Sequence, residues 1–469
     1  MSSSSELMHH PISQQPDESI TSNLHQAATN WEIGRERAKQ MVDWEAWRER
    51  AQAIKQRAIA NLPQLIVDLE TRISAVGGHV HHAQDATAAN AIISEICAQA
   101  NARLVVKSKS MTSEEIGLNS ALAEQNITAV ETDLGEYIVQ QLEQRPSHIL
   151  APAVHLNATQ IAALFERLSG QKMDGEDTNA MLDFARTRLR QAFEQADVGI
   201  TGANFAVAQT GTLILVESEG NIRYCTSLPR VHIALMGIEK LLENWDDAAH
   251  MMQMLVLSAH GRRASASTSF ITGPSRDGDD GPQEFHLVLL DNGRNSIREG
   301  EFSSTLNCIR CGACLYACPV YRQIGGHSYG STYSGPIGSV LTPLLEKSKE
   351  SEKLPWLSSL CGACSEACPV KIPLDDQLIA LRGEAQKPTV DLEAAMFKAW
   401  AMLWSHSGTY RASTSASSKI FPKLLARISR NNQGWTTKLP FPFSAWTKGR
   451  KARTPTESSF HERWQRNRD

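Results

Sequence analysis

The chain has 469 residues, of which 41% are hydrophobic and 6% aromatic, which suits a globular protein of two or three domains. No run approaches 18 consecutive apolar residues, and the start of the chain, 1–30, lacks a basic-then-apolar signal pattern. These features exclude a membrane-spanning helix and predict a cytoplasmic protein. The net charge of -4 is unevenly distributed, because residues 411–469 carry about +10.

Residues 1–69 are expected to form a polar leader followed by helices. The leader is rich in Ser, Gln and His, and apolar side chains recur at helical intervals after it. The repeating positions are Trp44, Trp47, Ala51, Ile54 and Ala58. We expect these helices to pack against the main body.

Residues 70–295 alternate short apolar runs with amphipathic segments, which predicts one α/β domain with a mostly parallel sheet. Strands are expected at His79–His81, Leu104–Val106, Ile127–Val130, Ile149–Ala151, Val198–Ile200, Val231–Met236 and His286–Asp291, with a hairpin over Ala203–Ser218. Helices are expected at Ala86–Ala98, Ser113–Glu124, Ala158–Ser169 and Ala180–Ala196. The Ser/Gly/Asp-rich run Gly261–Gly281 predicts a long loop.

Some polar residues of this domain are candidates for a small-molecule pocket. Glycines in the run Thr201–Thr212 let backbone N–H groups approach an anion, and Glu217 and Glu219 follow. The alternative is a tight hairpin that only needs positive φ. Cationic side chains that would pair with a carboxylate, or remain solvated at the surface, are Arg223, Arg230 and Lys240.

Isolated histidines and cysteines of the same domain carry no predicted function. His79 and His81 share one face of a strand and His82 points away, which makes a poor metal site. Cys97 and Cys225 stand alone in apolar surroundings, where a small buried side chain is the usual role.

Residues 296–390 hold seven of the nine cysteines, in two short motifs. The first is Cys308-x2-Cys311-x2-Cys314-x3-Cys318-Pro, and the second is Cys361-x2-Cys364-x3-Cys368-Pro. Three thiolates within seven residues before a Cys-Pro favour iron-sulfur clusters over zinc, which prefers separated Cys-x2-Cys pairs. Disulfides would spread the cysteines more widely. We therefore predict a helical ferredoxin-type domain with two clusters.

In this bacterial ferredoxin spacing the cysteine before proline ligates the other cluster. Cluster 1 is thus assigned to Cys308, Cys311, Cys314 and Cys368, as 4Fe-4S. Cluster 2 is assigned to Cys318, Cys361 and Cys364, and is one ligand short.

The place of the missing ligand in cluster 2 holds Ser358. Cluster 2 is accordingly expected to be 3Fe-4S, or 4Fe-4S with an oxygen ligand from Ser358 or elsewhere. Arg310, Arg322 and Lys371 are candidates to offset the negative charge of the clusters.

Residues 391–469 combine an amphipathic helix, Leu392–Ser405, with a basic tail. Packing on the cluster domain or a partner is the favoured interpretation of the helix. Adsorption at the inner face of the membrane is second, and nucleic-acid binding is last because no DNA-reading motif is present.

Over residues 35–465 the sequence resembles the iron-sulfur lactate utilisation protein B family. The resemblance rests on the two cysteine motifs, on the run Gly325–Gly338 between them, and on Gly199–Thr212. It implies an α/β LUD domain similar in fold to sugar-phosphate isomerases and CoA transferases, and an α-helical ferredoxin domain similar to that of succinate dehydrogenase. It also implies a role in L-lactate oxidation to pyruvate, with a cysteine-rich protein and a second LUD-domain protein as partners.

The leading functional hypothesis is therefore a non-catalytic subunit that relays single electrons through two clusters. The sequence has no G-x-G-x-x-G or P-loop pattern for a nucleotide, so substrate chemistry would come from elsewhere. One alternative makes the LUD domain a small-molecule enzyme with regulatory clusters. Another makes the chain an iron-sulfur sensor whose basic tail binds nucleic acid.

Overall fold

The computed structural model describes residues 18–276, 279–386 and 392–428, together with 435–436, 439, 444, 447, 451–453, 456 and 458–467. The chain divides into two compact units, 1–385 and 386–469. The domain boundaries expected within the first unit stay predictions.

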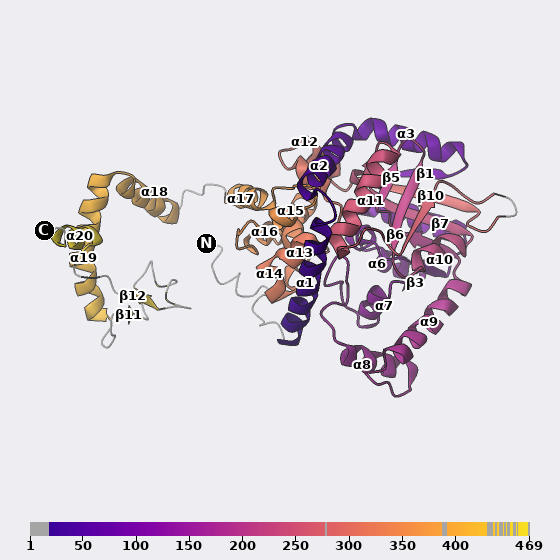
Figure 1. The fold of residues 1–469 in the computed structure, drawn as a ribbon, viewed down its shortest axis with the longest axis horizontal. Coiled ribbons are helices and arrows are strands. Elements are labelled where there is room, and N and C mark those ends of the chain that lie inside the picture. Colours follow the sequence, from indigo (N-terminus) through magenta and orange to yellow (C-terminus); the bar gives the residue numbers. More distant parts are fainter. Residues whose placement is uncertain are drawn as a thin grey trace. The chain divides into compact units, whose positions relative to one another are not determined.

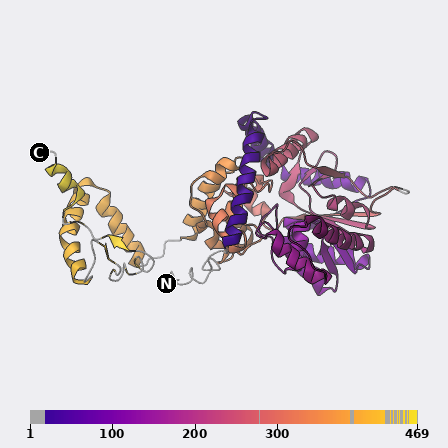
Figure 2. The ribbon, with the colours of Figure 1, turned by 60° about the horizontal axis from the view of Figure 1, so that its bottom comes forward.

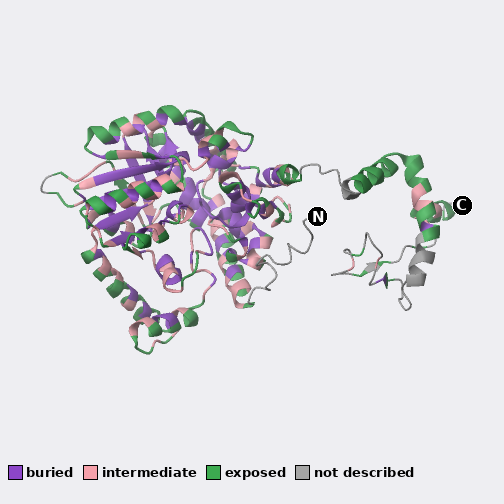
Figure 3. Ribbon diagram, turned by 180° about the vertical axis from the view of Figure 1, so that it is seen from behind, coloured by how far each residue is buried: buried purple, intermediate pink, exposed green. Residues whose placement is uncertain are grey.

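A six-stranded parallel sheet forms the centre of the α/β part (Figure 1). In spatial order its strands are β1 (His79–Ala83), β10 (Glu284–Leu290), β7 (Val231–Gly237), β4 (Val198–Thr201), β2 (Leu104–Lys107) and β3 (Thr128–Glu131). The middle strands are buried on both faces, as Figure 3 shows, which explains their near-continuous apolar runs. The predicted α/β class with a mostly parallel sheet is confirmed.

A second, smaller sheet of four strands packs beside the first. Its order is β8 (Leu241–Leu242), β5 (Phe205–Val207), β6 (Thr212–Glu217) and β9 (Ser267–Ile271). β5 and β6 are antiparallel, as the predicted hairpin requires. Gly211, at φ +73°, supplies the left-handed conformation in their turn.

Helices cover both faces of the parallel sheet. One face packs against α4 (Ala86–Gln99), α5 (Met111–Glu115) and α6 (Leu118–Glu124). The other packs against α3 (Leu62–Ala75), α9 (Thr178–Gln195) and α10 (Asn221–Ser227). Beyond them lie α7 (Leu134–Gln141) and α8 (Ala158–Ser169).

The cysteine-bearing segment is built from short helices. They are α12 (Arg294–Glu299), η3 (Ser303–Asn307), α13 (Ala313–Ala317), α14 (Pro319–Ile324), η4 (His327–Tyr329), α15 (Gly335–Glu346), η5 (Ser351–Trp356), α16 (Ala363–Ala367) and α17 (Leu374–Ala385). The expected helical character is observed. The closer likenesses, to the succinate dehydrogenase module and to isomerases and CoA transferases, stay predictions.

One continuous core joins the N-terminal helices, the second sheet and the cysteine segment. α1 (Glu18–Lys39) and α2 (Trp44–Ala60) run along both parts, and α1 contacts both α14 and α11 (Trp245–His260) (Figure 2). Trp31 of α1 contacts both parts. Its indole N–H donates to the Ser258 carbonyl at 2.8 Å, and its ring centroid lies 5.7 Å from that of Tyr316. The first unit is therefore one packed body.

The second unit contains α18 (Leu392–Trp404), α19 (Ser407–Ile428), β11 (Trp435–Thr436), β12 (Ala452–Arg453) and α20 (Phe460–Arg466). Large apolar side chains of α18 are exposed, among them Phe397, Trp400 and Met402. Among the described residues, no helix has the length and apolar content needed to cross a membrane. The leader up to residue 17 and much of the basic tail lie outside the described residues.

Three expectations about single elements were wrong, and one helix was not predicted. Ile149–Ala151 is not a strand but part of an irregular segment that lines two pockets. The Gly261–Gly281 run contains β9, and Ser113–Glu124 is divided into two helices at Gly117, whose φ is +63°. Helix α11 was missed, although most of its buried side chains are apolar.

Candidate iron-sulfur centres

The two cysteine motifs have the same backbone conformation. Gly312 and Gly362 take φ values of +73° and +79°, and the residues two before them, Arg310 and Leu360, take +61° and +56°. Each glycine is followed by a five-residue helix, α13 or α16, and these two helices contact each other. The motifs are thus structural repeats that face one another.

The first cysteine set lines one pocket. Cys308, Cys311 and Cys314 of the first motif line it together with Cys368 of the second, and their assignment to one cluster stays a prediction. The rest of the lining is almost entirely apolar, from Ile149, Ile309, Gly312, Ile337, Pro369, Val370, Ile372 and Leu374. A site with four sulfur donors and a dry wall fits a cubane cluster.

Backbone N–H groups point at the sulfur atoms. The Arg310 N–H lies 3.5 Å from Cys308 Sγ, and the Ile372 N–H lies 3.3 Å from Cys368 Sγ. Such donors stabilise thiolates. Burial acts in the other direction and raises the pKa of the Cys368 thiol to about 11, so an iron centre that takes up the thiolates would release protons.

The second set is more open. Cys318 and Cys364 are buried and Cys361 is exposed. Burial, and after it the charge of Cys318, raises the pKa of the Cys364 thiol to about 12. The Tyr321 N–H lies 3.5 Å from Cys318 Sγ.

Ser358 takes the position in the second motif that Cys308 takes in the first. Its Oγ accepts a hydrogen bond from the Leu360 N–H at 3.1 Å, just as Cys308 Sγ is approached by the Arg310 N–H. The two side chains therefore lie at corresponding places of the repeat. An oxygen atom is available where the pattern lacks a sulfur.

The cations expected near the clusters differ in their surroundings. Arg322 pairs with Glu32 at 2.5 Å and Lys371 pairs with Glu45 at 2.6 Å, so both charges are largely balanced by α1 and α2. Arg310 is buried, with Nη2 3.3 Å from Glu239 Oε1. Of the three, only Arg310 lies in the interior beside Cys308.

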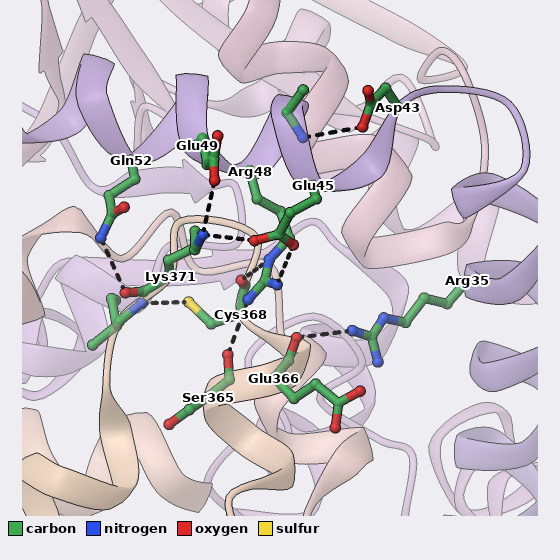
Figure 4. Close-up of polar contacts among 12 residues, drawn as sticks. Arg35, Asp43, Glu45, Arg48, Glu49, Gln52, Ser365, Glu366, Cys368 and Lys371 are labelled. Atoms are coloured by element: carbon green, nitrogen blue, oxygen red, sulfur yellow. Dashed lines mark hydrogen bonds and ion pairs between the residues drawn. The ribbon is translucent and has the colours of Figure 1, made fainter.

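Sequence reasoning missed two arginines of the N-terminal helices that hold the second motif (Figure 4). Arg48 of α2 donates to the carbonyls of Cys368 at 2.9 Å and Ser365 at 3.2 Å. Arg35 of α1 donates to the Glu366 carbonyl at 3.2 Å. These contacts span more than 300 residues of chain, so no local pattern signals them.

A larger pocket, of about 610 Å³, adjoins the first cysteine set, and Ile149 lines both. Its lining includes Asn204, Glu217, Glu219 and Lys240 of the predicted pocket, but not the glycines of the run Thr201–Thr212. Burial raises the pKa of Glu219 to about 7. Two proposed members lie elsewhere: Arg223 is outside the lining, and Arg230 forms an ion pair with Glu284.

The isolated cysteines are buried, as expected, and the isolated histidines contact other side chains. His81 Nε2 lies 3.1 Å from His286 Nδ1 on the neighbouring strand, and His82 pairs with Glu70 at 3.0 Å. In the described part of the chain, no three His, Cys, Asp or Glu side chains are placed to hold a single metal ion. Cys97 and Cys225 are fully buried, and burial raises the pKa of each thiol to about 12.

Family models match three successive parts of the chain: the LUD domain at 66–290, a 4Fe-4S dicluster domain at 304–372, and the C-terminal region of lactate utilisation protein B at 372–469. The lactate utilisation protein B of Shouchella clausii is 45% identical over 90% of this chain and 89% of its own. That of Macrococcus caseolyticus is 43% identical over 91% and 89%.

Proposed function

Because the chain belongs to the lactate utilisation protein B family, an iron-sulfur family, we propose that it relays single electrons through two clusters while L-lactate is oxidised to pyruvate. The observation that carries this proposal is the pocket in which cysteines of both motifs meet. Two clusters bound by crossed motifs are neighbours, and neighbouring one-electron centres form a short path for electrons.

The cysteines have distinct roles in this proposal. Cys308, Cys311, Cys314 and Cys368 hold cluster 1, a 4Fe-4S centre in the apolar pocket. Cys318, Cys361 and Cys364 hold cluster 2, with Ser358 Oγ as the fourth ligand of a second 4Fe-4S centre. Each cluster supplies a one-electron couple when bound.

The surrounding residues set the conditions for electron transfer. The apolar wall of the first pocket excludes water, and Arg310 places a positive charge beside it. Cys361 is exposed, so cluster 2 would lie nearer the surface. We infer that electrons enter or leave through this second centre, in contact with a partner.

The partners proposed are a cysteine-rich subunit and a second LUD-domain subunit of the same lactate utilisation system. The exposed apolar side chains of α18, among them Phe397 and Trp400, provide a surface for a partner or for peripheral contact with the inner face of a membrane.

The test is anaerobic purification followed by iron and sulfide counting and EPR, then mixing with the partners and L-lactate. About eight iron atoms per chain and reduction of both centres by lactate are expected. Cys368→Ala should remove cluster 1, whereas Cys97→Ala, which changes a buried cysteine far from the motifs, should keep both. Bound zinc, or clusters that stay oxidised with partners and lactate, would refute the proposal.

The large pocket favours a second candidate, in which the LUD part is itself an enzyme and the clusters regulate it. Turnover of a small carboxylate by the full-length chain, with the cysteines of both motifs replaced by alanine, would support this candidate.

A further inference from the structure

The pocket of about 610 Å³ lies where the α/β part meets the cysteine segment. Lys109, Glu219 and Lys240 line it from the α/β part, and Arg310 lines it from the first cysteine motif. Its volume falls within the range of small-molecule sites, roughly 300–1,000 Å³. No role follows for this pocket from electron relay alone.

Cationic side chains of this pocket have donor atoms without a partner. Among the described residues, the buried atoms Lys109 Nζ and Arg310 Nη1 have no hydrogen-bond partner, and Lys240 takes part in no hydrogen bond or ion pair. Arg310 Nη2 is paired with Glu239, but a buried donor atom without a hydrogen-bond partner is costly, and an anionic ligand would remove that cost.

The carboxylates of the pocket are, by contrast, already bonded. Glu217 accepts from the Ile222 N–H at 2.8 Å, and Glu219 accepts from the Leu134 N–H at 3.1 Å. A ligand therefore finds cationic donors without partners, and carboxylates that each already accept a backbone hydrogen bond. This asymmetry selects an anion over a cation.

The chemical character of the lining restricts which anions would fit the pocket. One wall is apolar, with Leu150, Val216 and Leu255 among its members. A carboxylate group of a ligand would pair with the cations, and a short carbon chain would pack on this apolar wall. A hydroxyl group of the ligand would donate to the remaining lone pairs of Glu219.

We propose that this pocket binds a small hydroxy- or oxo-carboxylate, with its carboxylate group on Lys240 and Arg310, beside the first cysteine set. The choice of L-lactate and pyruvate as probes rests on the proposed function. Balancing the charge of a cluster would account for Arg310, but not for Lys109, whose charged neighbours are the carboxylates of Asp133, Glu136, Glu219 and Glu131.

Equilibrium dialysis of the anaerobically purified full chain against labelled L-lactate or pyruvate tests the proposal without any electron transfer. Binding should be displaced by the other carboxylate and not by lactamide, which has the same size without the charge. Lys240→Gln should weaken binding about tenfold to a hundredfold, since a charge-assisted hydrogen bond is lost. Lys109→Gln should weaken it about tenfold.

Lys172→Gln is the matched control, because Lys172 is exposed and outside the pocket. It should bind like the wild type. Iron counting on each variant shows that it has folded and carries its clusters.

Three results would overturn the pocket proposal: no binding of either carboxylate, equal binding by the Lys240 and Lys172 variants, or displacement by lactamide. A change of cluster potential in Lys240→Gln with unchanged lactate binding would assign Lys240 to the cluster instead. If lactate binds but never reduces the clusters, the proposed electron relay fails and the binding site stands.

Discussion

At the scale of single residues, Ser358 stands in the second motif at the place that a cysteine takes in the first. The second motif keeps the positive φ of Leu360 and Gly362, and the Leu360 N–H bonds Ser358 Oγ at 3.1 Å. The backbone therefore presents the serine oxygen as the first motif presents the Cys308 sulfur. In the proposed function, this one side chain decides the type of cluster 2.

Replacing Ser358 by alanine should convert cluster 2 to 3Fe-4S, because no side-chain oxygen would hold the fourth iron. Iron content should fall from about eight to about seven atoms per chain, with a new EPR signal of an oxidised 3Fe-4S centre. Ser358→Cys, which restores a thiol, should keep about eight. Wild-type iron content retained in Ser358→Ala would show that another group completes the site.

A second residue-scale prediction concerns pH. His232 is fully buried, its Nε2 lies 2.8 Å from Thr201 Oγ1, and burial lowers its pKa from 6.5 to about 3. Below pH 6.5 His232 binds a proton in the unfolded chain but stays neutral in the folded chain. The free energy of unfolding therefore falls as pH falls from about 6.5 toward 3.

His232→Gln should reduce this acid sensitivity. Between pH 7 and pH 5 the histidine accounts for about 2 kcal/mol of lost stability, at about 1.4 kcal/mol per pH unit below its unfolded pKa. Urea unfolding at the two pH values measures the difference between wild type and variant. Parallel losses in both proteins would place the acid sensitivity at other groups.

At the scale of elements, the N-terminal helices hold the cysteine segment in place. Arg48 of α2 and Arg35 of α1 donate to carbonyls of the second motif, and Lys371 is paired with Glu45 of α2 (Figure 4). Helices that the sequence marks only as amphipathic thus contribute to the site.

Arg48→Met should loosen the second motif, since two hydrogen bonds from a charged donor are lost, each contributing about 1.5–3 kcal/mol. Faster release of iron to a chelator is expected. Arg50→Met, on the exposed side of the same helix, should leave the rate unchanged. Equal rates in both variants would show that α2 does not stabilise the clusters.

At the scale of the whole molecule, the chain consists of a large unit that holds every cysteine and a C-terminal unit that holds none. The core joining α1, α2, the second sheet and the cysteine segment lies within the first unit. Cluster binding should therefore be independent of the second unit.

Ending the chain at Gln386 should preserve iron and sulfide content and the thermal unfolding temperature of the first unit. Any function of the exposed α18 surface in partner or membrane contact should be lost in the same variant, as measured by co-purification and vesicle sedimentation. Loss of iron on truncation would show that the C-terminal unit takes part in the cluster sites.

The sequence by itself determined the parallel α/β domain and the family, because strand-helix alternation and the cysteine spacing are local patterns. The crossed spacing also implies the pairing of Cys368 with the first motif; Cys368 lines the same pocket as that motif, and its assignment to cluster 1 stays a prediction.

Only the tertiary structure placed Arg48 and Arg35 on the second motif, and Lys109 and Lys240 with Arg310 around one pocket. These residues are separated by up to several hundred positions in the chain. Their proximity is set by the packing of one core, and local sequence patterns carry no information about such distances.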